Sequence, residues 1–223
     1  MKPRIAIDGP AGAGKSTVAR AVARKLGLTY LDTGAMYRAI TLSALRKGVN
    51  MDDPSELSRL AQQASLEIKN NGPDNQNLVF LDDRDVTEEI RLPEVSRNVS
   101  VVARCPEVRA ILADRQRQTG RRGGVVMDGR DIGTNVMPDA EYKFFLTASL
   151  EERARRRQAE LAARGEDISL TQMMSEIAAR DKIDSERECA PLRPAPDAIH
   201  IDTTEKTVEQ VVLAIVAAAC NRC

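Results

Sequence analysis

Short apolar runs recur along the chain and alternate with segments in which apolar residues repeat at helical spacing. Five of these runs are expected to form strands of the core: 4–8, 29–31, 125–127, 142–146 and 199–202. Helical patterns fill the intervals between them. Strands that alternate with helices predict an α/β fold, in which a parallel sheet has helices on both faces. In such sheets ligands bind at the carboxyl ends of the strands, so we look for functional residues there.

Local signals mark the ends of several predicted helices. The pattern at 15–26 ends before Gly27, and glycine is the residue that most often follows a helix. Two serines are followed three residues later by Glu152 and Gln172, which predicts capping boxes that begin helices at Ser149 and Ser169. A last apolar stripe at helical spacing covers 208–219.

One stretch departs from the alternation of strands and helices. The segments 65–69 and 78–81 have strand character, and turn signals follow them at 70–72 and 82–85. We therefore expect a small antiparallel sheet inserted between the second and third core strands. The helical patterns that lead back to the core are 94–103 and 107–122.

Composition limits the classes of partner. The 223 residues include 42% apolar residues, enough for one α/β domain with insertions. The 33 basic and 33 acidic residues cancel, so no overall field attracts nucleic acid or a membrane surface. Aromatic residues make up only 3%, with no tryptophan, which argues against a base-stacking surface for single strands. We expect neither nucleic acid nor a membrane as a partner.

The cysteines and the apolar runs indicate the compartment. No leader is expected before the first strand, and the longest apolar run, 211–220, is too short to span a bilayer. The four cysteines form no recognisable disulfide framework, and a zinc site at Cys220 and Cys223 lacks a second ligand pair. We expect a cytoplasmic protein.

A phosphate-binding motif follows the first predicted strand. The letters GPAGAGKST match the P-loop pattern and predict an ATP site formed by Gly9, Pro10, Ala11, Gly12, Ala13, Gly14, Lys15, Ser16 and Thr17. The glycines let backbone N–H groups surround phosphate oxygens, and the next helix directs its positive end at them. Lys15 is expected to contact the β- and γ-phosphates, and the Ser16 hydroxyl to bind Mg²⁺.

The remaining motifs favour a small-molecule kinase among P-loop proteins. The D-x-x-G and N-K-x-D strings of GTPases are absent. The predicted helix after Ser149 carries Arg153 and Arg157 one turn apart, with Arg156 nearby. Arginines on one face repel each other, which can be a tolerated surface feature. They can also form a clamp for the charge that develops during phosphoryl transfer. We prefer the clamp, on a lid that closes over the donor.

The acceptor is less constrained by residue chemistry. The single histidine, His200, has no motif around it and is expected to be a packing residue. A phosphate monoester is already ionised and needs no base, whereas an alcohol needs a carboxylate such as Asp32, Asp128 or Asp131. Residue chemistry alone favours a nucleoside monophosphate as the acceptor and does not exclude an alcohol.

Four further strings resemble the bacterial-type cytidylate kinases: LDTGAMYRA, the segment 100–109, MDGRDIGT and RDKIDSER. The resemblance runs from the first strand to the last helix. It implies a five-stranded parallel core and an enlarged monophosphate-binding insertion at about 38–105. It also implies a helical lid at about 149–168, which leaves 1–37, 106–148 and 169–223 as the core.

The resemblance also implies roles for individual residues. The monophosphate is expected to bind Arg38, Arg130 and Arg187, with the hydroxyl of Thr33 where some relatives have serine. The cytosine is expected to be recognised by Ser100, Arg109 and Asp131, and the pentose by Asp184 and Arg180. Ser16, and Asp32 through water, are expected to hold Mg²⁺. The predicted catalytic residues are Lys15, Arg130, Arg153 and Arg157.

The implied reaction is ATP + CMP → ADP + CDP, with dCMP also accepted, by direct in-line transfer in a monomeric enzyme. Simpler interpretations remain for single residues: Arg130 and Asp131 can form an ordinary strand-end salt bridge, and Asp184 can pair with Arg187 three residues away. Two other functions also remain. One is a kinase for another small acceptor, and the other is a regulatory module that binds ATP without transferring phosphate.

Overall fold

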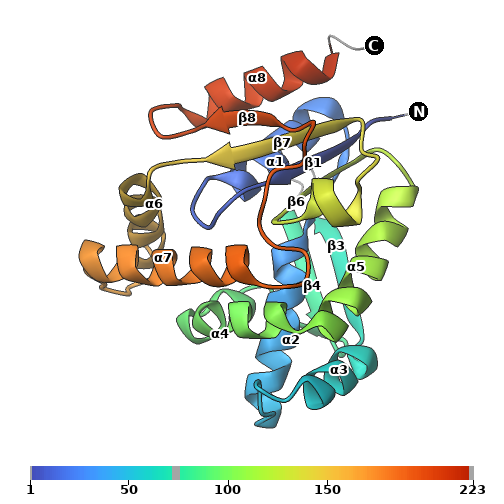
Figure 1. The fold of residues 1–223 in the computed structure, drawn as a ribbon, viewed down its shortest axis with the longest axis vertical. Helices are drawn as coiled ribbons and strands as arrows, with labels where there is room; N and C mark the ends of the chain where they lie inside the picture. Colours follow the sequence, from blue (N-terminus) through green and yellow to red (C-terminus); the bar gives the residue numbers. More distant parts are fainter. Residues whose placement is uncertain (1, 72–75, 221–223) are drawn as a thin grey trace.

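A five-stranded parallel sheet forms the centre of the computed structural model, which describes residues 2–71 and 76–220 (Figure 1). The strand order is β2-β6-β1-β7-β8, and every neighbouring pair is parallel. This confirms the predicted sheet. Its strands are β1 (Arg4–Asp8), β2 (Thr29–Asp32), β6 (Val125–Gly129), β7 (Tyr142–Thr147) and β8 (Ile199–Asp202).

Helices cover both faces of the sheet, as predicted. On one face α1 (Lys15–Leu26) and α8 (Val208–Cys220) share a core with Ile7, Phe144 and other buried strand residues. On the opposite face Ala113 of α5 (Pro106–Arg121) packs with Ala6, Met127 and residues of a short π-helical segment, η2 (Ile132–Val136). Both of these layers are apolar, so the sheet is buried on both faces, as is typical of a parallel sheet.

The register brings the carboxyl ends of three strands together. Asp8 at the end of β1 is aligned with Gly129 of β6, and Asp32 at the end of β2 is aligned with Asp128. Three carboxylates therefore lie at one edge of the sheet, which is where ligands of such sheets bind.

The predicted insertion is present as a second layer, in the lower part of Figure 1. Its antiparallel sheet contains β3 (Leu66–Asn71), β4 (Gln76–Leu81) and a short third strand, β5 (Arg84–Asp85), which the sequence did not indicate. The turn predicted at 70–72 differs: Asn70 and Asn71 pair with β4, and Gly72 lies outside the described residues. The second turn, predicted at 82–85, is present at Asp82 and Asp83 only, because Arg84 and Asp85 pair with β4 as strand β5.

Helices complete the insertion. Residues of α2, α3, β4, η1, α4 and α5 share one large apolar cluster that includes Ile40, Leu57, Ile90 and Leu112. The predicted helices 94–103 and 107–122 correspond to α4 and α5. The bounds are α2 (Thr33–Lys47), α3 (Pro54–Gln63), η1 (Glu89–Arg91) and α4 (Pro93–Arg104).

Two helices, α6 (Leu150–Ala162) and α7 (Leu170–Glu186), lie side by side at the left of Figure 1. Both predicted caps are present: the Ser149 hydroxyl accepts from the Glu152 N–H, and the Ser169 hydroxyl from that of Gln172. None of the helices in the described part of the chain is long and apolar enough to cross a bilayer.

Candidate active site

A cavity of about 740 Å³ lies between the sheet edge, the insertion and the helix pair α6–α7. The residues predicted to bind the acceptor all line it. The structure thus brings together Thr33, Arg38, Ser100, Arg109, Arg130, Asp131, Arg180, Asp184 and Arg187. Most of the P-loop and Asp32 also line it, as does Arg157. Gly9, Pro10, Ala13 and Arg153 do not.

The P-loop connects β1 to α1 through backbone that only glycine adopts easily. Gly9 has φ +148° and Gly12 has φ +77°, both in the positive region. A Cβ atom on Gly9 would lie 2.0 Å from the carbonyl oxygen of Leu146, so the loop is packed against the end of β7. Helix α1 has no side-chain cap at its start. Its first N–H groups therefore point into the cavity without a capping partner, as an anion site requires.

Lys15 is buried, and its Nζ donates to the carbonyl oxygen of Pro10 at 2.6 Å. Burial and the nearby Arg130 guanidinium hold the pKa of Lys15 well below its ordinary value. The ammonium group has a neutral acceptor and no carboxylate within ion-pair distance among the described residues. A phosphate oxygen would supply the missing negative charge.

The residues that could hold a metal ion lie close together, beside Lys15. The Ser16 hydroxyl donates to Asp128 Oδ2 at 2.8 Å, and the Tyr30 hydroxyl donates to Asp128 Oδ1 at 2.8 Å. Burial and the neighbouring Asp32 raise the pKa of Asp128. Asp32 also caps α2 by accepting from the Ala35 N–H. No group of three or more His, Cys, Asp or Glu side chains in the described ranges 2–71 and 76–220 forms a metal cage.

These oxygen atoms are suited to ligate a divalent ion that also binds the phosphates of a nucleotide. A hydroxyl and carboxylates are oxygen ligands, and Mg²⁺ commonly keeps several waters and binds substrate phosphates rather than a complete protein cage. The residues that would hold it are Ser16 directly, with Asp32 or Asp128 through water.

A buried ion cluster forms the deep end of the cavity. Arg109 Nη2 and Asp131 Oδ2 are 2.6 Å apart, and their side chains are 2% and 7% exposed. Arg187 lies 3.5 Å from Asp131 and 3.7 Å from Asp184, and Arg130 Nε donates to Asp184 at 2.9 Å. Each carboxylate thus contacts two arginines. The simple pairing of Asp184 with Arg187 is present, but only as part of this cluster.

Several buried donors of the cavity lack an acceptor. Within the described part of the chain, Arg109 Nε, Arg180 Nε and Arg187 Nη2 have no hydrogen-bond partner. Burial and neighbouring arginines lower the pKa of Arg180 to about 10. Buried donors without partners are costly, so the cavity is built for a ligand that carries several acceptor atoms.

The two arginines Arg153 and Arg157 of α6 differ in their surroundings. Arg153 is buried behind the P-loop: it pairs with Asp181 at 2.5 Å and donates to the carbonyl oxygen of Ala11 at 3.1 Å. Arg157 faces the cavity, where it donates to Ser96 and to Glu160. The sequence suggested uncompensated repulsion between these arginines. In the structure each has an acidic partner.

Four residues of the site were not indicated by the sequence analysis. Asp8 accepts the N–H groups of Ile132 and Gly133, both at 2.8 Å, and so holds the segment that follows Asp131. Its position directly before the P-loop was the available signal.

Ser96, Arg91 and Asn77 lie in the insertion, and no local motif marks them. Ser96 and Arg91 line the cavity, and Asn77 ties β4 to β2 through the backbone of Tyr30 and Asp32.

Known proteins resemble this chain over nearly its whole length. The family model described as cytidylate kinase matches residues 5–221. A cytidylate kinase of Pelotomaculum thermopropionicum is 59% identical over 96% of this chain and 95% of its own length. One of Bacillus pumilus is 54% identical, with 98% and 96% covered.

Among solved structures, a shikimate kinase from Acinetobacter baumannii is similar in fold. It has a TM-score of 0.50 and 14% identity, and the match covers 100% of this chain and 95% of that one.

Proposed function

The chain belongs to the cytidylate kinase family, and we propose that it transfers the γ-phosphoryl group of ATP to CMP, with dCMP as a second acceptor. The observation that carries the proposal is the single cavity that joins the P-loop to an arginine-rich pocket with unpartnered buried donors. A nucleoside monophosphate offers the phosphate and base acceptors that these donors lack.

Different residues of the pocket would bind the phosphate and the pentose of the acceptor. Arg38, Arg130 and Arg187 would hold the monophosphate through charge-assisted hydrogen bonds, with Thr33 beside them. The Thr33 hydroxyl donates to the carbonyl oxygen of Asp128, so it would meet a phosphate only as an acceptor or after rotation. Asp184 and Arg180 would contact the pentose.

The base would bind at the deep end, near Ser100 and the Arg109–Asp131 pair. Asp131 can accept from the cytosine amino group, and Arg109 keeps an unpartnered Nε for a base acceptor. The carboxylate accepts hydrogen bonds from Arg109 and Asn135 on Oδ2, whereas Oδ1 has only the longer ion pair with Arg187 Nη2 at 3.5 Å, so Oδ1 is the atom that would accept from the base.

Transfer itself would require positioning and charge stabilisation rather than a protein nucleophile. Lys15 would leave the carbonyl oxygen of Pro10 and donate to the β- and γ-phosphates of ATP. Arg130 and Arg157 would approach the transferred group from the acceptor and lid sides. Mg²⁺, held through Ser16, would neutralise charge on the phosphates when bound.

Arg153 acts in this proposal by supporting the P-loop. Its contacts with Ala11 and Asp181 join the loop to α6 and α7, so lid closure and the donor site would move together. The lid would exclude water and so suppress hydrolysis of ATP. We also propose the division into core, insertion and lid at about 38–105 and 149–168, a monomeric state and a cytoplasmic location.

One assay tests the function. ADP release is measured with ATP and Mg²⁺ against CMP, dCMP, UMP, AMP, GMP, shikimate and no acceptor. We expect turnover with CMP and dCMP well above the others. A preference for a different acceptor would identify another kinase, and no acceptor-dependent release in the presence of ATP binding would favour a regulatory module.

A further inference from the structure

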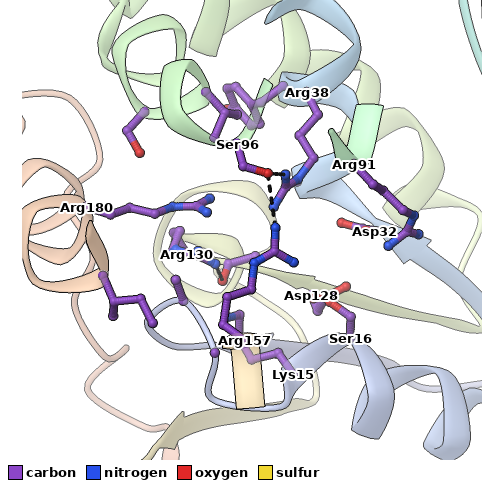
Figure 2. Close-up of a pocket in the computed structure, with 18 of the residues that line it drawn as sticks. Lys15, Ser16, Asp32, Arg38, Arg91, Ser96, Asp128, Arg130, Arg157 and Arg180 are labelled. Carbon is purple, nitrogen blue, oxygen red and sulfur yellow. Dashed lines mark hydrogen bonds between the residues drawn. The ribbon is translucent and has the colours of Figure 1, made fainter. Parts of the chain in front are cut away.

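Three side chains from distant parts of the sequence meet at one oxygen atom. Ser96 of α4 accepts from Arg38 Nη1 of α2 at 2.8 Å and from Arg157 Nη2 of α6 at 3.2 Å. Figure 2 shows the hydrogen bonds from both guanidinium groups to the hydroxyl, with Lys15 and Ser16 beyond Arg157 in this view. The contact joins the acceptor pocket to the lid helix α6 through side chains.

The two guanidinium groups have little other compensation on this side. Arg38 has no ion pair in the part of the chain that the structure describes, and burial together with Arg180 and Arg157 lowers its pKa to about 9. Glu160, the acidic partner of Arg157, also lines the cavity but is 64% exposed, so solvent screens its charge. Like charges held this close repel each other unless an acceptor lies between them. A hydroxyl oxygen has two lone pairs and can accept from both.

We propose that Ser96 is a positioning residue: it orients Arg38 towards the acceptor phosphate and Arg157 towards the transferred group before the substrates bind. The inference rests on the proposed function. Each guanidinium carries five N–H donors, and the bridge uses one from each, so both can donate to a phosphate while the bridge persists. The hydroxyl is neutral, so it holds the arginines without competing as strongly as a carboxylate would.

A purely structural role makes a different prediction. Ser96 is the fourth residue of the helix α4, where alanine is the better helix former. Loss of the hydroxyl should then leave stability unchanged or slightly higher and should not alter nucleotide affinity. If Ser96 positions the arginines, its loss leaves two cations without their shared acceptor, and CMP must order them on binding.

The test uses the full chain in three variants: Ser96→Ala, Ser96→Thr and a control, Asn98→Ala. Asn98 is on the same helix, and its side chain donates to the backbone of Glu94 and does not line the cavity. Calorimetry gives the Kd of CMP without ATP, steady-state assays give KM for each substrate and kcat, and thermal melts check the fold.

Ser96→Ala is expected to raise the Kd and the KM of CMP about tenfold, the size expected for one hydrogen bond to a charged group. The KM of ATP should stay within about twofold, because Ser96 is not near the P-loop. Ser96→Thr should restore CMP affinity, and Asn98→Ala should match the original protein.

The double variant Ser96→Ala with Arg38→Lys tests the route through Arg38. If Ser96 acts on CMP by orienting Arg38, its loss should change CMP affinity less in the Arg38→Lys background. Unchanged CMP affinity in Ser96→Ala would overturn the inference, as would equal losses for ATP and CMP or an equal loss in Asn98→Ala. An unaltered protein that does not phosphorylate CMP would instead overturn the proposed function.

Discussion

Replacing Asp131 with asparagine should destabilise the substrate-free protein, because this carboxylate compensates two buried guanidinium groups. Arg109 and Arg187 are both 2% exposed, at 2.6 Å and 3.5 Å from Asp131. The amide keeps the shape of the side chain but removes its charge. It also turns an NH₂ group towards a donor in place of one carboxylate oxygen. Within residues 2–71 and 76–220, Asp184 then remains as the one acidic partner of Arg187, at 3.7 Å.

Breaking a buried ion pair by removing one partner costs about 3–5 kcal/mol. In a chain of this size, each 1 kcal/mol lowers Tm by roughly 2–4 °C. We therefore expect Asp131→Asn to lower Tm by about 10 °C or more in thermal unfolding followed by circular dichroism. The matched control is Glu151→Gln, which removes the exposed partner of Arg155 at 2.6 Å and should shift Tm by only about 1 °C.

The same variant separates stability from recognition. The KM of CMP should rise, while the Kd of ATP should stay close to that of the original protein, because Asp131 lies away from the P-loop. A Tm within about 2 °C of the original protein would refute the reasoning that Asp131 compensates the buried arginines. Equal losses for CMP and ATP would mean that Asp131 acts only through the fold.

Three further changes have definite expected outcomes. Lys15→Ala should lower kcat about a hundred- to thousandfold with an unchanged fold, and near-normal turnover would exclude the proposed donor site. Gly9→Ala should cost about 3 kcal/mol or more in chemical unfolding, because its Cβ would lie 2.0 Å from the Leu146 carbonyl, whereas Gly27→Ala, with open space around it, should cost only about 1 kcal/mol. Burial raises the pKa of Asp8 to about 6, so the folded state binds more protons than the unfolded state between about pH 4 and 6. The stability of the original protein relative to Asp8→Asn should therefore fall as pH rises through that interval, and a constant difference in unfolding free energy would contradict this.

Elements with strong local patterns were predictable. The five core strands are short apolar runs, and the caps at Ser149 and Ser169 depend on residues only three positions away. Helix α2 was not specified beyond the general expectation of helices between strands. Ten of its fifteen residues are buried, so it has no broad polar face and little periodicity to detect. Strand β5 is two residues long, too short to have a pattern.

Site residues were predictable where a local motif contains them. They were not predictable where the contact forms only because distant parts of the chain pack together. The P-loop and the strings around Arg38, Arg130 and Asp184 led to residues that line one cavity. The bridge at Ser96 joins residues 58 and 61 positions away, which no local pattern encodes. The same reason explains Arg153, whose partner Asp181 is 28 positions away.

The partners of the cations suggest a rule for their roles. Lys15 and Arg38 donate to neutral oxygens, the carbonyl of Pro10 and the hydroxyl of Ser96. A phosphate can replace or join such acceptors at low cost, because it adds the charge that the site lacks. Arg153 is held by a carboxylate, from which an incoming anion would have to displace it against electrostatic attraction. For these three cations, the neutral acceptors of Lys15 and Arg38 suit contact with substrate, and the carboxylate partner of Arg153 suits a role in keeping the site in shape. Arg130 combines both, since Nε is bound to Asp184 while Nη1 contacts only the carbonyl oxygen of Gly129.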